Sequence, residues 1–353
     1  MKKKADRKLL SKARDLLAAE IVQVTGCTEP ASVAFAFMTA QRYLSAPFDP
    51  RVGKASLYGS DEVLRNASTA VVPFLNRRGL RTVVAAGLSS EALSFDLFPS
   101  VDRGAARALL NRRGWMIVRR AGRKGVYVRA VLRMPGELVE VLIDGHHDEI
   151  RQVTRNGKCL QRSVPRRAAS ISIPEIMAVA RARDRGLELM VREFIVRQVR
   201  GDRRKPLPER VAELIRGRMC GSSEPVITVT GSGNHGIFLG VPFYALYRNY
   251  GTRILPAVVV ALLAEVHMTA ESSRISEDCG LGTKASPALA AGLAFAQGAG
   301  EKKIITLMRS VSNTLRKLEC HGAKASCGGK AKKAMRVVME RVGTVVSASA
   351  KSR

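Results

Sequence analysis

Cysteines in short glycine-rich loops are the residues of this sequence best suited to chemistry. The chain has six cysteines, and four of them lie in GCTEP at residues 26–30, EDCGLG at residues 277–282 and ECHGAKASCGGK at residues 319–330. Another loop, TGSGNHG at residues 230–236, offers small polar side chains. Backbone N–H groups in such loops can approach an anion, and their thiols can reach a shared metal. Each loop taken alone is better explained as an ordinary helix cap or turn.

Composition limits the classes of protein that can use these loops. The chain has 353 residues, of which 46% are hydrophobic and 25% charged, so it can bury a large core. Its net charge of +29 would suit an anionic partner, but aromatic residues make up only 5%, too few for stacking single-stranded bases. Its apolar runs are too short to span a bilayer. Six scattered cysteines do not make a disulfide framework, so we expect a cytoplasmic protein.

The loops require helices on both sides to hold them. Apolar residues recur at helical spacing over residues 8–22, and this helix is expected to end at Gly26. Thr28 is a candidate N-cap and Pro30 suits a first turn, so a second helix is predicted over residues 31–44. GCTEP is therefore expected to end at a helix N-terminus, where backbone N–H groups lack partners.

The middle of the chain has a different pattern. WMIVRRA, GVYVRAVLR, ELVEVLIDG and DEIRQVT are β-rich runs separated by turns, which indicates an antiparallel meander preceded by a helix at residues 101–113. His146 and His147 fall in one of these turns and are expected to be solvated. Helical patterns return from residue 173 onward. We predict an α+β protein: a mainly helical domain formed by residues 1–50 and 161–353, with a smaller α+β domain inserted at residues 51–160.

Taken together, the motifs resemble the L-cysteine desulfidase family, which is related to the alpha chain of the iron-sulfur L-serine dehydratases. The resemblance rests on GCTEP, on TGSGN-x-G, on a Cys-Gly about forty residues before C-x-GAK-x-x-C, and on the β-rich segment ending in GHHDEIRQVTRNG. It implies a lyase that needs no pyridoxal phosphate. Such a lyase uses a 4Fe-4S cluster held by three cysteines, with the fourth iron open to the substrate.

The resemblance also implies which cysteines hold the cluster. They would be Cys27, Cys279 and Cys320, with Cys327 in reserve. Thiolates are the usual protein ligands of such clusters, and an iron without a protein ligand can act as a Lewis acid. Cys159 and Cys220 lie outside the motifs, and we expect both to be buried structural thiols.

The expected reaction is β-elimination of L-cysteine to sulfide and aminoacrylate, which becomes pyruvate and ammonia. A base must remove the Cα proton, and Lys324 is the first candidate because desolvation beside a cationic site lowers a lysine pKa. His321 and His235 are the other candidates. The residues expected to bind the substrate are Thr28, Glu29, Ser232, Gly233 and Asn234.

Two other functions stay open at this point. An iron-sulfur L-serine dehydratase would share the cluster and differ in its leaving group. A basic nucleic-acid-binding protein would need no cluster, but basic groups such as Arg119, Arg120 and Arg123 are spread over separate turns, as on a solvated surface. We therefore expect a small amino acid as the partner, and neither nucleic acid nor a membrane. Assembly into a homo-oligomer stays open.

Overall fold

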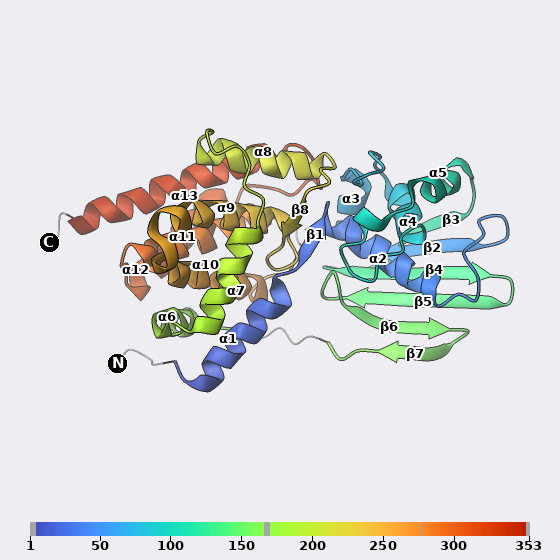
Figure 1. The fold of residues 1–353 in the computed structure, drawn as a ribbon, viewed down its shortest axis with the longest axis horizontal. Coiled ribbons are helices and arrows are strands. Elements are labelled where there is room, and N and C mark those ends of the chain that lie inside the picture. The colour runs from blue at the N-terminus through green and yellow to red at the C-terminus, as the bar shows by residue number, and fades with distance from the viewer. Residues whose placement is uncertain (1–4, 166–169, 276, 351–353) are drawn as a thin grey trace.

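The protein has a mostly helical part and a sheet flanked by helices, which lie side by side along its longest axis (Figure 1). The computed structural model describes residues 5–165, 170–275 and 277–350, with side chains up to residue 343. The chain is α+β with helices at both ends, so the predicted fold class is confirmed.

The sheet has six strands in the order β3-β2-β4-β5-β6-β7. Its strands are β2 (Lys54–Gly59), β3 (Met116–Arg120), β4 (Tyr127–Met134), β5 (Glu137–Asp144), β6 (Ile150–Arg155) and β7 (Lys158–Arg162). β4, β5 and β6 form an antiparallel meander as predicted, and β7, which was not predicted, extends it. The prediction was wrong for β3, which pairs in parallel with β2 instead of joining β4. β2 lies between them, because it also pairs antiparallel with β4.

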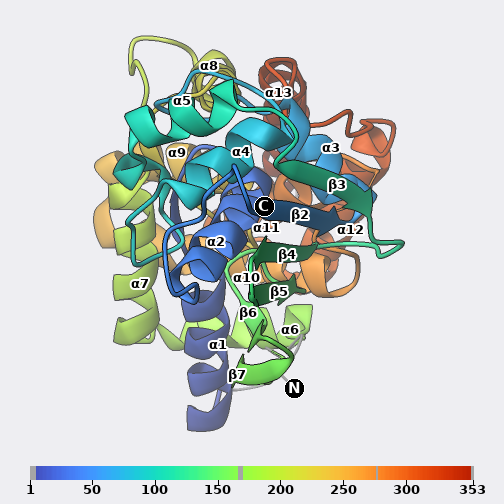
Figure 2. The same ribbon diagram turned by 90° about the vertical axis from the view of Figure 1, so that its right-hand side faces the viewer.

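Helices α2 (Thr28–Arg42), α4 (Leu80–Leu88) and α5 (Arg103–Asn111) lie on one face of this sheet (Figure 2). The sheet part also contains α3 (Asp61–Thr69) and the 3-10 turn η1 (Phe98–Ser100). α2 contacts β4 and β5, although the predicted boundary at residue 50 assigns it to the helical domain. α4 approaches α2 closely at Gly87, where a Cβ would lie 2.3 Å from the carbonyl oxygen of Ala34. The division of the chain into two domains stays a prediction.

The helical part surrounds two central helices, α10 and α11, which contact each other extensively. Its helices are α1 (Arg7–Glu20), α6 (Ile173–Ala182), α7 (Arg185–Arg197), α8 (Leu207–Met219), α9 (Gly233–Tyr250), α10 (Leu255–Ala270), α11 (Ser286–Ala296), α12 (Glu301–Leu315) and α13 (Cys327–Ala350), with the short turns η2 (Gly251–Ile254) and η3 (Leu281–Ala285). One segment, Gly233–Ala270, is long and apolar enough to cross a membrane, but 78% of its most apolar window is buried inside the protein. This burial is usual for the core helix of a soluble protein.

The segment before GCTEP differs in detail from its prediction. α1 ends at Glu20, and the strand β1 (Gln23–Thr25) follows it. β1 pairs antiparallel with β8 (Pro225–Ile227), which precedes the TGSGNHG loop. Cys27 takes the N-cap position of α2 in place of Thr28, which is the first helical residue. The short β1–β8 ladder therefore links the two loop regions across about two hundred residues of sequence.

Candidate functional site

One cavity of about 100 Å³ brings the predicted loops together. Its wall includes Cys27, Cys279, Cys320 and Cys327, which come from loops nearly three hundred residues apart in sequence. Cys27 and Cys279 are buried, and the other two are half-buried. The fold thus places all four cysteines of the motifs around one space, although their roles as ligands stay predictions.

The position of Cys27 depends on the glycine before it. Gly26 has a φ of +74°, and a Cβ there would lie 2.6 Å from Cγ of Pro73. Only glycine adopts this conformation and tolerates this contact without cost. Cys27 then caps α2, and its carbonyl oxygen accepts a hydrogen bond from the N–H of Ala31 at 3.1 Å. The thiol is therefore fixed at the start of a helix.

The loops of Cys279 and Cys320 are joined by their backbones. The N–H of Cys279 donates to the carbonyl oxygen of Leu318 at 2.7 Å, and the N–H of Cys320 donates to that of Glu277 at 2.6 Å. Residue 327 begins α13, so the remaining thiol also lies at a helix N-terminus. Two segments that are forty residues apart are thereby held in register around the cavity.

The thiols are strongly affected by their surroundings. Burial raises the pKa of Cys27 far above its ordinary value, and the nearby Glu29 raises it further. Burial also raises the pKa of Cys279 to about 11, and the neighbouring Cys320 and Cys327 add to this effect. Burial raises the pKa of Cys327 in the same way. As thiolates these groups need compensating positive charge, which metal ions supply when they bind cysteine.

Glu29 is the most extensively bonded of the expected substrate-binding residues. Its side chain accepts hydrogen bonds from Asn66 Nδ2 at 2.9 Å, Thr28 Oγ1 at 3.2 Å and Cys27 Sγ at 3.4 Å. Burial acts to raise the pKa of Glu29, but His147, the Asn66 amide and other groups outweigh it, so the pKa is lowered. Glu29 is therefore held as a buried carboxylate at the cavity.

The other expected substrate-binding residues surround the same space. Thr28, Ser232 and Asn234 line the cavity. Gly233 begins α9 and packs against the guanidinium of Arg218, where a Cβ would lie 2.6 Å from Cζ. The TGSGNHG loop thus supplies the polar side chains of Ser232 and Asn234 to the cavity wall, and its Gly233 lies close to Arg218 of that wall.

His235 is the one predicted base that lines the cavity. Its Nδ1 lies 2.6 Å from Oε1 of Glu265, a fully buried carboxylate that also accepts a hydrogen bond from Thr230. The opposite edge of the ring faces Gly280, where a Cβ would lie 2.6 Å from Nε2. Glu265 therefore holds the His235 ring with its free edge toward the Cys279 loop.

His147 lines this cavity and was not expected there. The prediction of a solvated turn was wrong, because the side chain is only 5% exposed and lies against Gly231 of the TGSGNHG loop. Neither ring nitrogen has a hydrogen-bond partner among the described residues. Burial lowers the pKa of His147, as do Arg274 and Arg218, against the opposing effect of Glu29. The imidazole is thus buried at the cavity wall beside Glu29, with both ring nitrogens unbonded in the described part of the chain.

Several other predicted residues lie elsewhere. Lys324 and His321 are exposed and are not part of the cavity wall. Cys159 and Cys220, expected to be buried, are both exposed. In their place, the wall contains three cations that the sequence did not single out, Arg218, Arg274 and Lys284. The chain has 59 lysines and arginines, so nothing in the sequence distinguishes these three.

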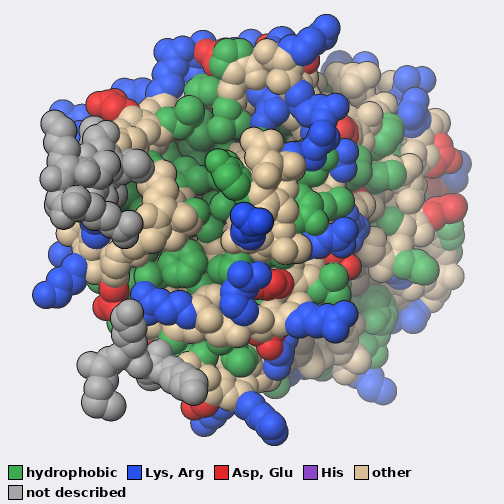
Figure 3. Space-filling view, turned by 60° about the vertical axis from the view of Figure 1, so that its left-hand side comes forward, with side chains coloured by type: hydrophobic (Ala, Val, Ile, Leu, Met, Phe, Trp, Pro, Cys, Tyr) green, Lys and Arg blue, Asp and Glu red, His purple; other side chains and the backbone are tan. Residues whose placement is uncertain are grey.

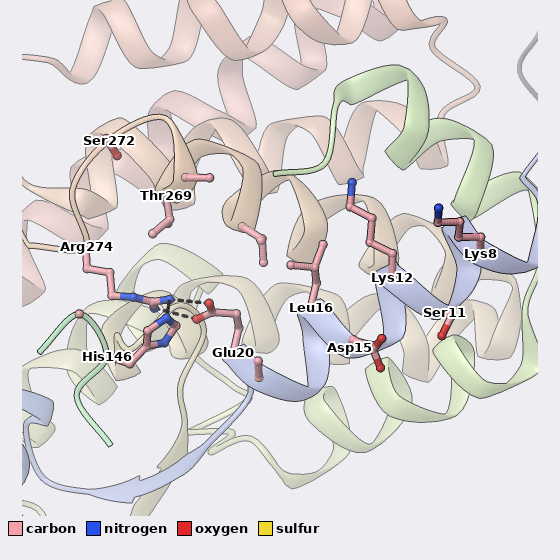
Figure 4. Close-up of a pocket in the computed structure, with 14 residues that line it drawn as sticks. Lys8, Ser11, Lys12, Asp15, Leu16, Glu20, His146, Thr269, Ser272 and Arg274 are labelled. Atoms are coloured by element: carbon pink, nitrogen blue, oxygen red, sulfur yellow. Dashed lines mark hydrogen bonds and ion pairs between the residues drawn. The ribbon is translucent and has the colours of Figure 1, made fainter. Parts of the chain in front are cut away.

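A larger cavity of about 650 Å³ opens beside α1 and the end of α10. Figure 4 shows Lys8 and Lys12 on one side of it and the Arg274–Glu20 ion pair at the other end. Arg274 donates to Glu20 at 2.7 Å and 2.5 Å, and it also lines the cysteine cavity. The ion pair therefore lies between the larger cavity and the cysteines.

The positive charge is dispersed on the face seen in Figure 3. There, Lys and Arg side chains are scattered among hydrophobic and polar ones. A groove that binds a nucleic-acid backbone gathers its basic side chains along one path. This face therefore offers no support for the nucleic-acid alternative.

The four-thiol wall fits an iron-sulfur cluster in its donor chemistry. In the described part of the chain, no three His, Cys, Asp or Glu side chains lie as ligands of one metal ion. A cluster differs from a single ion because separate thiolates bind separate irons. Cys27, Cys279, Cys320 and Cys327 offer four separate thiols around one cavity, two of them buried and two half-buried, which matches that requirement.

Known proteins resemble this chain along most of its length. The profile of the family described as serine dehydratase alpha chain matches residues 111–348, more than half of the chain. The chain therefore belongs to the serine dehydratase alpha chain family. It is also similar to proteins named only as UPF0597 protein. The one from Thermosipho africanus is 24% identical over 90% of this chain and 85% of its own length. Another, from Methanocella arvoryzae, is 27% identical over 93% and 85%.

Proposed function

We propose that the protein is an iron-sulfur lyase that removes sulfide from L-cysteine by β-elimination. The observation that carries this proposal is the single cavity lined by Cys27, Cys279, Cys320 and Cys327. Membership of the serine dehydratase alpha chain family supports the lyase class. The first three cysteines are the proposed ligands of a 4Fe-4S cluster, and the fourth is the reserve ligand.

The cluster would supply a Lewis-acidic iron that favours departure of the substrate sulfur. The chain's own residues bind the substrate and move its proton. The buried carboxylate of Glu29 suits the substrate ammonium group, and Thr28 beside it offers a hydroxyl at the start of α2. These contacts would fix the Cα–H bond relative to the cavity wall.

We assign the base to His147, because its nitrogens are buried without a protein partner at the cavity wall. The Cα proton passes to a ring nitrogen of His147, and the Cβ–S bond breaks with its electron pair going to sulfur. The aminoacrylate that remains tautomerises, and water hydrolyses it to pyruvate and ammonia. No oxidant or reductant is needed. The roles predicted for Lys324, His321 and His235 stay untested, and the exposure of the first two makes them weaker candidates.

The second candidate function is an L-serine dehydratase, which the name of the family supports. Both reactions need the same proton removal and differ in the leaving group, hydroxide for serine and sulfide for cysteine. Assays for sulfide from L-cysteine and for pyruvate from L-serine, on the same preparation, separate them. Faster turnover of serine would replace the cysteine assignment with the dehydratase.

The cluster is tested on protein purified without oxygen. We expect about four irons and four acid-labile sulfides per chain. Cys27→Ser, Cys279→Ser and Cys320→Ser should each lose most of this content. Cys220→Ser is the matched control, because this cysteine is exposed and outside the cavity. Colourless wild-type protein that turns over L-cysteine would rule out the cluster.

A further inference from the structure

Arg218 is a buried cation in the cavity wall whose hydrogen-bonding capacity is mostly unused. It lies in the last turn of α8 and is only 4% exposed. Its Nη1 donates to Asn234 Oδ1 at 2.9 Å. Its Nε and Nη2 have no hydrogen-bond partner among the described residues. Burial of a guanidinium with unpaired N–H donors costs free energy of folding unless an anion accepts hydrogen bonds from those donors.

Arg218 lines the cavity that also contains Cys27 and Glu29, so its guanidinium is within reach of a ligand bound there. Glycine at position 233 makes room for the guanidinium, since a Cβ there would lie 2.6 Å from both Nε and Cζ. Asn234 fixes the guanidinium from the side of Nη1, which leaves Nε and Nη2 as a pair of donors. This pair has the geometry that binds both oxygens of one carboxylate.

The other cations of the wall are already engaged. Arg274 makes two hydrogen bonds to the carboxylate of Glu20. Lys284 donates to the backbone carbonyl oxygens of Ser273 and Arg274. Among the described cations that line the cavity, Arg218 is therefore the one with donors to spare.

We propose that Arg218 binds the α-carboxylate of the amino-acid substrate through Nε and Nη2, and so restricts the site to free α-amino acids. This inference rests on the proposed function for the identity of the ligand, and it names a binding residue that the sequence did not indicate. Arg218 and Glu29 then contact opposite ends of the substrate backbone. An amide or ester in place of the carboxylate would leave the guanidinium buried without an anion.

The test uses L-alanine, which has no leaving group, and L-alaninamide, which has no carboxylate. Binding is measured by calorimetry on the full-length protein, loaded with iron and sulfide under anaerobic conditions. The wild-type protein should prefer L-alanine, and Arg218→Gln should weaken L-alanine binding about tenfold to a hundredfold. Binding of L-alaninamide should change little. Arg218→Lys keeps the charge without the paired donors and should recover only part of the loss.

Arg210→Gln is the matched control, since Arg210 is also a buried arginine of α8 but does not line this cavity. Circular dichroism and iron content are measured for every variant. If Arg218→Gln loses iron while Arg210→Gln retains it, Arg218 supports the thiolates and the carboxylate assignment is wrong. A wild-type protein without preference for L-alanine over L-alaninamide also overturns it.

Failure of this inference can be told apart from failure of the proposed function. In one outcome the wild-type protein lacks iron and turnover but binds L-alanine in preference to L-alaninamide, and Arg218→Gln loses that preference. This outcome contradicts the proposed function and supports the carboxylate site. A protein that turns over L-cysteine with an unchanged KM after Arg218→Gln contradicts the carboxylate site and leaves the function standing.

Discussion

Gly26→Ala should destabilise the protein through its backbone conformation and through a contact with Pro73. Alanine at a φ of +74° costs about 1–2 kcal/mol in backbone conformation. Its Cβ would also lie 2.6 Å from Cγ and 2.8 Å from Cδ of Pro73, and relieving such crowding costs a further 1–3 kcal/mol, approximately. We expect the free energy of unfolding to fall by about 2–5 kcal/mol in total.

Gly136→Ala is the matched control for the backbone cost. Gly136 has the same φ of +74°, in the turn between β4 and β5, and nothing lies within 4 Å of its added Cβ. Urea titrations followed by circular dichroism give both free energies of unfolding. The excess loss in Gly26→Ala measures the Pro73 contact, and Pro73→Ala in the same chain should remove most of that excess. Equal losses for the two glycine variants would refute this account of the Cys27 loop.

The remaining predictions concern the site and the surface charge. His147→Gln should lower kcat about a hundredfold or more with iron content retained, the usual effect of losing a positioned base, whereas Lys324→Ala at its exposed position should change kcat little. When metal-free protein is alkylated at pH 8, the exposed Cys220 should react first. Cys279 should react slowly, because its pKa of about 11 keeps the thiol protonated. Mass spectrometry of the adducts tests this order. Binding to duplex DNA should be weak, independent of sequence and steeply reduced by salt in fluorescence anisotropy, because the basic side chains are scattered on the face seen in Figure 3.

Local pattern was sufficient for much of the fold. Alternating apolar residues and turns identified β4, β5 and β6, and helical spacing identified α1 and α2. The same sequence pattern did not show which strands pair when they lie far apart in the sequence. β3 follows a helix and precedes β4 in sequence, yet β2 separates them in the sheet. A strand's own residues specify that it is extended, while its partner is decided by packing over the whole sheet.

At the candidate site, too, local sequence motifs could be predicted, but contacts between distant segments could not. The cysteine loops were recognisable because cysteine is rare and their glycine-rich context is specific. Arg218 was not, because it lies within an ordinary helical pattern of a strongly basic chain. His147 was assigned to solvent because it follows a hairpin strand, but its ring is buried and lies against Gly231 of a distant loop. Contacts between loops from different parts of the chain created both features.

Three of the cavity's cysteines lie at or just before the start of helical segments. Cys27 caps α2, Cys279 precedes η3 by two residues, and Cys327 begins α13. Helix N-termini favour negative charge and would lower a thiol pKa in an open site. Burial has the opposite effect and is the larger influence on all three. The protein therefore places three buried or half-buried thiols at helix N-termini, an arrangement that would become favourable if the thiolates bound cationic irons as proposed.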